Sequence, residues 1–468
     1  MDNTERNTGI SLTRADPASG SRFAGVISLG QALRYWLKLG FISFGGPAGQ
    51  IALMHRDLVD DKRWISEKRF LHALNYCMLL PGPEAQQLAT YMGWLMHRTW
   101  GGILAGALFV LPSLFILIAL SWVYMAYGHT TLVAGLFFGI KPAVVALVVQ
   151  AVVRIGSRTL SNAWLWSIAV ASFVAMFVLH VPFPAIVAVA GALGWLRGRL
   201  APSAFGSGSG SGSAHQASKA KPSHAPALID DDTPLAEHTR FRWTRFAWVV
   251  ATGLLLWAAP MGLLAWALGA THPYTLMAGF FTKAALLTFG GAYAVLPYVY
   301  QGAVVSHGWL TPTQMMDGLA LGETTPGPLI MVVSFVAFVG GYVLQPLEGA
   351  SALMGGVVAA LIVTWFTFLP SFIFILAGAP LVESTRHDIK FTAPLAAITA
   401  AVVGVVLNLA LFFAWHTWWP AGWEGGVAAV PVALSVMAGL ALIRFKRSPM
   451  EVIAACALMG LAVHAFVA

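Results

Sequence analysis

The chain has 468 residues, of which 58% are hydrophobic and only 10% are charged. Ordinary soluble proteins carry about 25% charged residues, so this composition excludes a soluble enzyme. The net charge of +8 does not indicate nucleic-acid binding, because Lys and Arg form short clusters beside apolar runs. Apolar runs near the ~20 residues that cross a bilayer predict an all-α polytopic membrane protein. These runs are 101–126, 132–153, 161–179, 246–269, 351–377, 393–414 and 427–443.

The N-terminal residues 1–27 are polar and contain no apolar stretch, which predicts a cytoplasmic tail and no cleavable signal peptide. Cys77 and Cys456 both lie within apolar segments, so we expect neither a disulfide framework nor a thiolate metal site. The chain has no phosphate-loop, zinc-protease or nucleophile motif. We therefore expect no enzyme activity, no metal and no cofactor.

Two glycine- and proline-rich motifs occur twice in the chain. A shift of 245 residues aligns F-G-G at 44–46 with 289–291, and P-G-P at 81–83 with 326–328, without a gap. Agreement of several unusual residues at one period indicates an internal duplication. The matched residues are Lys38, Gly45, Gly46, Trp64, Pro81, Gly82 and Pro83 in the first copy and Lys283, Gly290, Gly291, Trp309, Pro326, Gly327 and Pro328 in the second.

A polar tract at 201–240 separates the two copies. It contains a Gly-Ser alternation, natural or introduced, which indicates a flexible cytoplasmic linker. We assign 28–200 to the first transporter repeat and 271–468 to the second. The segment 241–270 has no counterpart in the first copy and is predicted to be an additional transmembrane helix.

Basic residues predict opposite orientations for the two copies. Segment 56–69 of the first copy is rich in Lys and Arg, whereas 301–316 of the second copy has none. Cytoplasmic flanks are enriched in Lys and Arg, so the first segment is predicted to be cytoplasmic and the second to lie outside. One additional crossing between the copies inverts the second, which places the N-terminus in the cytoplasm and the C-terminus outside. Such antiparallel, inverted repeats are typical of secondary transporters.

The segments beside the motifs are too short to span a bilayer, which predicts broken or re-entrant half-helices. Glycine permits positive φ and proline removes a backbone donor, so P-G-P interrupts a helix. Irregular backbone is tolerated at membrane depth only where protein buries it or it lines a wet cavity. Four helices are expected to begin directly after the motifs, following Gly46, Pro83, Gly291 and Pro328. The first turn of each helix presents unpaired N–H groups, which favour binding of a tetrahedral oxyanion. The alternative is that these residues only permit close helix packing.

Charged residues inside apolar segments are candidates for substrate binding and coupling. Lys141 lies well inside one run, and Lys38 and Lys283 either attract the anion or extend to the interface. Glu323, just before a P-G-P motif, is predicted to carry a coupling proton, because burial favours the neutral carboxyl group. Glu84 begins a helix, which stabilises its charged form and favours a structural role.

Several polar residues lie near the motifs. Gln86, Gln87 and Asn75 either donate hydrogen bonds to the substrate or pack between helices. Each copy also contains Leu-Pro-Ser, at 111–113 and at 369–371, under a different shift. The predicted partners are an oxyanion and the lipid bilayer, without nucleic acid. The sequence leaves open whether the protein forms a homodimer. Fusion of the two copies in one chain removes the need for a dimer but does not prevent one.

These motifs resemble those of the chromate ion transporter superfamily, in its long two-domain bacterial form. The resemblance rests on F-G-G-P at 44–47, W-I-S at 64–66 and P-G-P at 81–83, together with the motifs of the second copy. It implies efflux of chromate across the bacterial inner membrane, with sulfate as a similar competitor and chromate resistance as the result. The second copy departs from the pattern by having Ala292 in place of Pro47.

Two other functions fit an inverted repeat with an anion site. A carrier of a phosphate-containing lipid requires a groove that opens to the bilayer beside the site. A passive anion channel requires continuous wetting and conducts ionic current. Composition and spacing lead only to an anion transporter, whereas chromate and the export direction rest on the resemblance.

Overall fold

The computed structural model describes residues 27–44, 46–200, 227–230, 237–289, 291–347, 349–384 and 392–467. The predicted N-terminal tail, apart from Ile27, and the Gly-Ser tract of the linker lie outside the described residues. The described residues are helical apart from loops and one isolated bridge between Ile65 and Ile229. This confirms the expected all-α class.

The helices of the first copy recur in the same order in the second, which supports the predicted duplication. The first copy contains α1 (Leu29–Ile42), α2 (Gly46–His55), the π-helix η1 (Arg56–Asp61), α3 (Glu67–Leu79), α4 (Glu84–Tyr127), α5 (Thr131–Thr159), α6 (Ala163–Phe177) and α7 (Phe183–Leu200). The second contains α9 (Pro273–Leu286), α10 (Ala292–Tyr300), the π-helix η4 (Gln301–Ser306), α11 (Pro312–Thr324), the 3₁₀-helix η5 (Leu329–Met331), α12 (Val332–Leu344), α13 (Ala352–Ser384), α14 (Thr392–Trp418), α15 (Ala429–Ile443) and α16 (Pro449–Val467). Between the copies lie η3 (Glu237–Thr239) and α8 (Trp243–Ala267).

In the described part of the chain, seven helices are long and apolar enough to cross a membrane, namely α4, α5, α7, α8, α13, α14 and α16. The chain is therefore a multi-pass membrane protein. The expected runs at 161–179 and 427–443 form α6 and α15, which have only 15 residues each. Sequence analysis missed α7 and α16, because Arg197 and Arg199 end the former and Glu451 lies within the latter.

Helix α4 contains a sharp turn. The backbone leaves the helical region at His97 and at Arg98, where φ is 59°. The two arms pack against each other, since a Cβ on Gly93 would collide with the carbonyl oxygen of Gly101. The second copy builds the corresponding pair from two separate helices, α12 and α13. The loop between these two helices is longer than the turn in α4, which explains the different shift of the Leu-Pro-Ser motif.

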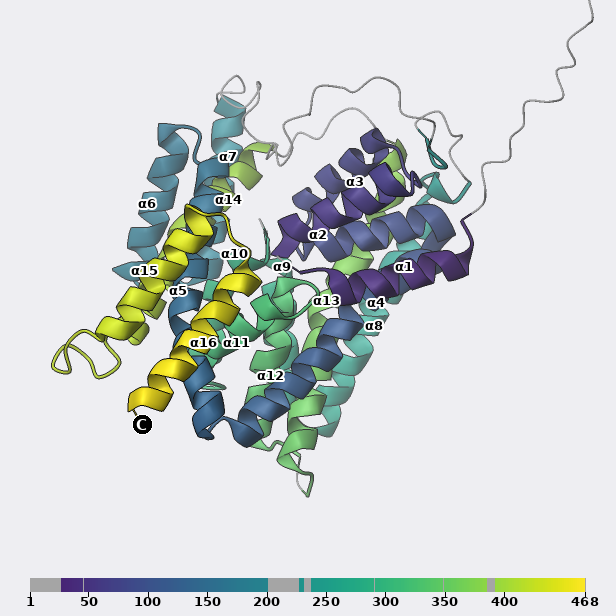
Figure 1. Ribbon diagram of the computed structural model, residues 1–468. Coiled ribbons are helices and arrows are strands. Elements are labelled where there is room, and N and C mark those ends of the chain that lie inside the picture. The colour runs from purple at the N-terminus through teal and green to yellow at the C-terminus, as the bar shows by residue number, and fades with distance from the viewer. Residues whose placement is uncertain are drawn as a thin grey trace, which may run out of the picture.

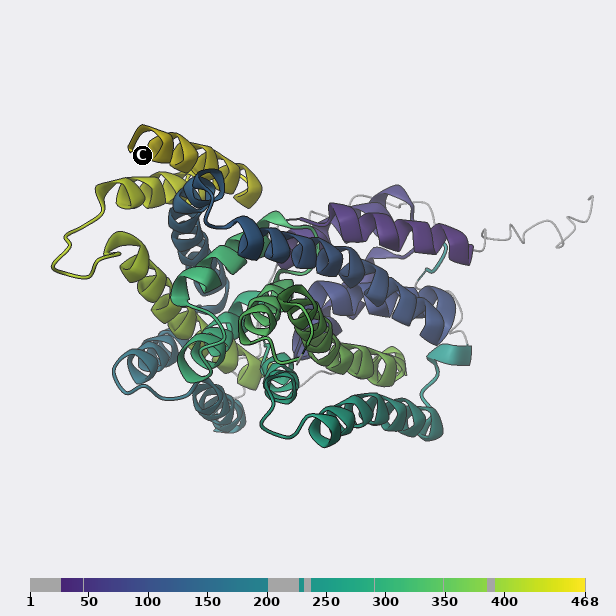
Figure 2. The same cartoon turned by 90° about the horizontal axis from the view of Figure 1, so that it is seen from below.

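The two copies interlock. Figure 1 shows α5, α6 and α7 beside α14, α15 and α16 on the left, and α1 to α4 with α8, α9, α12 and α13 on the right. The view from below keeps this division (Figure 2). On the left, α5 packs against α15 and α16, and α14 packs against α6 and α7. On the right, α13 packs against both α4 and α9. Each group therefore contains helices from both copies.

Local capping residues determine where α3 and α11 begin. Ser66 accepts a hydrogen bond from the Arg69 amide at the start of α3. Thr311 and Gln314 form a capping box at the start of α11, with Pro312 in the first helical position. These equivalent ends fix where α3 and α11 begin, and therefore where they meet the P-G-P motifs.

The crossing of α5 and α16 depends on small residues. A Cβ on Gly139 would overlap the backbone carbonyl of Cys456. We expect Gly139→Leu to force the helices apart and to reduce the free energy of unfolding by about 1–3 kcal/mol. Thermal unfolding in detergent measures this as a lower Tm. The control is Gly262→Leu on α8, where nothing lies within 4 Å of an added Cβ. Equal Tm values for the two variants would contradict this account of the crossing.

Candidate functional site

Each P-G-P motif interrupts a helix, and each of these two breaks forms a backbone hydrogen bond with the other copy. The Gly82 amide donates to the carbonyl oxygen of Thr288 at 2.8 Å, and the Gly327 amide donates to that of Ser43 at 2.9 Å. The 245-residue shift that relates Gly82 to Gly327 also relates Ser43 to Thr288. The two bonds are therefore reciprocal, and the breaks meet where the two copies join.

The glycines of the breaks adopt backbone angles that other residues disfavour. φ is 129° at Gly82 and 104° at Gly327, as the sequence predicted. Space is also limiting, because a Cβ on Gly82 would collide with the Ser371 hydroxyl, and one on Gly327 would lie 2.5 Å from the Cβ of Ser113. Each break therefore packs against the Leu-Pro-Ser serine of the other copy.

Helices begin after all four motifs, as expected. α2 starts at Gly46 with a φ of 70°, and α10 starts after Gly291 with a φ of 98°. α4 starts after Pro83, and the segment after Pro328 begins as the short 3₁₀-helix η5 before it continues as α12. Gly45 and Gly290 lie outside the described residues.

Buried amides and hydroxyls surround the breaks. The Gln50 amide donates to the carbonyl oxygens of Gly327 and Ser43. The Gln87 amide donates to the Pro81 carbonyl oxygen at 2.8 Å. The hydroxyls of Ser43 and Ser113 are buried and have no hydrogen-bond partner among the described residues. A buried polar group without a partner is costly, so these hydroxyls are available to a ligand.

The remaining predicted amides have different surroundings. Gln86 is buried and donates to the Thr90 hydroxyl at 3.0 Å. Asn75 is exposed and lines a hollow along α3 with His72. Of the predicted amide donors, only Gln87 therefore binds a break directly.

Sequence analysis missed Ser43, Thr288, Ser113, Ser371 and Gln50. A signal existed for the first four, since Ser43 and Thr288 both precede F-G-G, and the Leu-Pro-Ser motif ends in Ser113 or Ser371. Gln50 corresponds to Val295 in the second copy, so the repeat could not mark it.

Three carboxylates lie on the helices that adjoin the breaks. Glu323, near the end of α11, is buried and accepts a hydrogen bond from the Tyr293 hydroxyl. Glu84 is half-buried at the start of α4. Sequence analysis missed Asp317, which is buried on α11 and accepts a hydrogen bond from Tyr124 at 2.8 Å. The other oxygen of Asp317 has no hydrogen-bond partner in the described part of the chain.

The predicted lysines are not gathered at one point. Lys141 lies within electrostatic range of Asp317, so its charge is partly compensated. Lys38 and Lys283 are exposed on α1 and α9. Lys283 lines a hollow with His307. In the described residues, Lys38 and Lys283 form no ion pair within 4.0 Å.

The two copies differ in how the half-helices pack. α10 packs against α14, and α11 packs against α5. The equivalent pairs in the repeat are α2 with α5 and α3 with α14, and no comparable packing joins them within the described ranges. The exposure of equivalent side chains follows this difference. On α11, Ala320 is buried, whereas the equivalent Asn75 on α3 is exposed. On α10, Pro297 is buried, whereas the equivalent Ala52 on α2 is exposed. The second copy is therefore covered, and the first is open.

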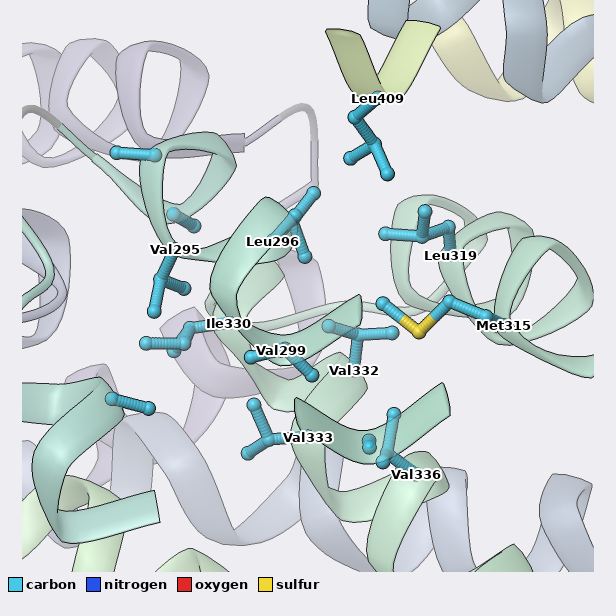
Figure 3. Close-up of a cluster of buried hydrophobic side chains, with 14 of the residues drawn as sticks. Val295, Leu296, Val299, Met315, Leu319, Ile330, Val332, Val333, Val336 and Leu409 are labelled. Atoms are coloured by element: carbon cyan, nitrogen blue, oxygen red, sulfur yellow. The ribbon is translucent and has the colours of Figure 1, made fainter. Parts of the chain in front are cut away.

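The covered side has a continuous apolar core. Figure 3 shows Val295 and Leu296 of α10 beside Ile330 of η5, while Leu319 of α11 lies below Leu409 of α14. All five side chains are buried. Burial of this apolar surface holds α10 and α11 against α14. Among the helices that the structure describes, none packs over α2 and α3 in the way that α14 and α5 pack on α10 and α11.

A family model described as chromate transporter matches residues 30–195 and 275–461. The chain belongs to the chromate transporter family. The two matched segments correspond to the two copies, and the membership confirms the expectation of a transporter and not an enzyme. No solved structure matches the chain.

Three relatives of this family member cover most of its length. A chromate transport protein of Pseudomonas aeruginosa is 33% identical over 80% of this chain and 78% of its own. A chromate transport protein of Cupriavidus metallidurans is 28% identical over 96% of each chain. A probable chromate transport protein of Synechococcus elongatus is 28% identical over 80% of this chain and 81% of its own.

Substitutions in the breaks test this site. We expect Gly82→Val and Gly327→Val each to abolish transport, because a β-branched residue at positive φ costs about 1–3 kcal/mol and the added side chain collides with the other copy. Both variants should still reach the membrane, which immunodetection in the membrane fraction checks. Gly262→Val, in open space on α8, is the matched control. Transport retained in both break variants would show that the breaks are not part of the transport site.

Proposed function

We propose that the protein exports chromate from the bacterial cytoplasm across the inner membrane by alternating access, with sulfate as a competing substrate. Chromate resistance would be the result. The assignment of chromate as the substrate rests on relatives that are named chromate transport proteins and align with most of the chain. The observation that carries the mechanism is the reciprocal bonding of the two breaks, from Gly82 to Thr288 and from Gly327 to Ser43.

The site at the breaks has the chemistry that a tetrahedral oxyanion requires. The four helices that begin at the motifs offer backbone N–H groups and the positive ends of their dipoles; they follow Gly46, Pro83, Gly291 and Pro328. The buried hydroxyl of Ser43, which has no hydrogen-bond partner in the described part of the chain, supplies a further donor next to Gly327. Chromate and sulfate have the same shape and charge, so N–H and O–H donors would discriminate weakly between them.

We further propose that the two copies have opposite orientations in the membrane. The basic cluster in 56–69 covers η1 and the start of α3, whereas 301–316 has no Lys or Arg. Helix α8 provides the one additional crossing that inverts the second copy. In this arrangement the N-terminus is cytoplasmic and the C-terminus is periplasmic.

The difference in packing between the copies supports a proposal for the state of the transport cycle. The uncovered surfaces of α2 and α3 belong to the copy with the cytoplasmic basic cluster, and the covered α10 and α11 belong to the other copy. The structure then corresponds to an inward-open state. Exchange of the two packing arrangements between the copies produces the outward-open state.

Glu323 is the proposed proton carrier. It is buried, lies one residue before the end of α11 and three residues before Pro326, and its carboxylate accepts a hydrogen bond from the Tyr293 hydroxyl. A group in this position changes surroundings when α11 separates from α5. Glu84 is the first residue of α4, where the helix dipole favours a negative charge, and it has the proposed role of a structural charge.

Uptake into everted membrane vesicles tests the proposed function. We expect saturable chromate uptake that sulfate inhibits, because both dianions use one site, and that a protonophore reduces. Radiolabelled chromate measures the uptake. Ionic current without saturation would indicate a passive channel. Movement of a phosphate-containing lipid by inserted protein that takes up no chromate would indicate a lipid carrier.

The same assay tests the coupling residue. Glu323→Gln removes the proton-binding group but keeps its size, so uptake in this variant should no longer respond to the protonophore. Glu451→Gln is the control, because Glu451 is exposed on α16 and pairs with Arg447. A normal response to the protonophore in Glu323→Gln would assign proton coupling to another residue.

Cysteine labelling tests the orientation. Cys77 and Cys456 are both buried, so the background is low. We expect Lys62→Cys to react with an impermeant thiol reagent only from the cytoplasmic side, and Gly308→Cys only from the periplasmic side. Intact cells and everted vesicles provide the two sides. Labelling of both positions from the same side would exclude the inverted arrangement.

A further inference from the structure

Helix α5 carries two arginines next to the breaks. Arg154 and Arg158 are one helical turn apart, so they lie on the same face of α5. Arg154 is within electrostatic range of Glu323 and Tyr293, and Arg158 is within range of Glu84. These three partners come from α11, α10 and α4, and each lies within three residues of a motif. The arginines therefore lie near the site, on a helix that contains no motif itself.

Neither guanidinium group forms a close ion pair in the described residues. In the part of the chain that the structure describes, no carboxylate lies within 4.0 Å of either. Arg154 is half-buried and Arg158 is exposed, on the helix that α2 leaves uncovered. A partly buried charge without a close partner is unfavourable, and an anionic ligand would satisfy it.

The second copy shows that these arginines are not required for packing. The 258-residue shift of the Leu-Pro-Ser motif also aligns Ala-Val-Val at 143–145 with 401–403, and it places Phe412 at the position of Arg154 and His416 at that of Arg158. Phe412 packs on Tyr300, with ring centroids 4.4 Å apart. The equivalent surface of α14 is thus aromatic and covered, whereas that of α5 is cationic and open.

We propose that Arg154 and Arg158 bind the substrate oxyanion directly and supply the positive charge of the site, a role that rests on the proposed function. A guanidinium group donates two parallel hydrogen bonds to two oxygens of a tetrahedral anion. Two such groups balance the two charges of chromate or sulfate, and the helix starts supply further donors. The open surface of α5 places these contacts on the cytoplasmic approach to the breaks.

The test compares single variants in the vesicle assay and in purified protein. We expect Arg154→Gln and Arg158→Gln each to raise the KM for chromate about tenfold or more, as for loss of a charged hydrogen bond, while the amount of inserted protein stays unchanged. Arg→Lys variants keep the charge but lose the forked geometry, and should fall in between. Arg199→Gln on α7 is the control, since that guanidinium lies over Trp195, 4.0 Å from the ring centroid.

Thermal unfolding in detergent separates a binding role from a structural one. Sulfate and chromate should raise the Tm of the wild-type protein and of Arg199→Gln, because a ligand stabilises the state that it binds. The same anions should leave the Tm of the double variant, with Arg154→Gln and Arg158→Gln combined, unchanged. If the double variant has a lower Tm than the wild-type protein without ligand, but the anions raise its Tm as much as that of the wild-type protein, the arginines have a structural role. That result would overturn the proposal.

The outcomes distinguish this proposal from the proposed function. Chromate transport by the wild-type protein together with a wild-type KM in both Arg→Gln variants would overturn the role of the arginines alone. Absence of both transport and anion-induced stabilisation in the wild-type protein would overturn the proposed function, and the role of the arginines with it.

Discussion

Every backbone polar group in the membrane interior requires a partner, and this constraint shapes the centre of the molecule. The P-G-P motifs break two helices, and each break exposes an amide that its own copy leaves unpaired. The Gly82 amide finds Thr288 and the Gly327 amide finds Ser43, both in the other copy. Neither copy therefore completes its hydrogen bonding alone. The interlocked arrangement of α5 with α15 and α16, and of α14 with α6 and α7, keeps the copies together around these bonds.

The centre is equivalent in the two copies, but its flanks are not. The reciprocal bonds at the breaks match under one shift, whereas α10 and α11 are covered and α2 and α3 are open. A fixed centre between two surfaces in different packing states is the arrangement that alternating access requires. The sequence contributes to this difference, because aromatic Phe412 on α14 stands where α5 has Arg154. The surface of α14 packs Phe412 against Tyr300, whereas the surface of α5 carries a charge at the equivalent position.

Local signals explain what was predicted correctly. The starts of α3 and α11 follow from capping residues that act within four positions. The breaks follow from proline and glycine, whose backbone preferences need no tertiary partner. Predictions that depended on apolar length were less accurate, since charged ends hid α7 and α16. The turn at His97 and Arg98 had no glycine or proline to mark it, and it forms because the two arms of α4 pack closely at Gly93.

The sequence by itself determined the membrane class, the duplication, the break positions and the family, because composition, periodicity and unusual triplets are properties of the chain alone. Tertiary structure decided which groups meet. It paired Gly82 with Thr288, placed Asp317 beside Tyr124, and brought Arg154 within electrostatic range of Glu323. These contacts join residues far apart in the chain, so no local pattern encodes them. Only the packing of helices from both copies brings them together, because burial of apolar surface and pairing of backbone groups must be satisfied at once.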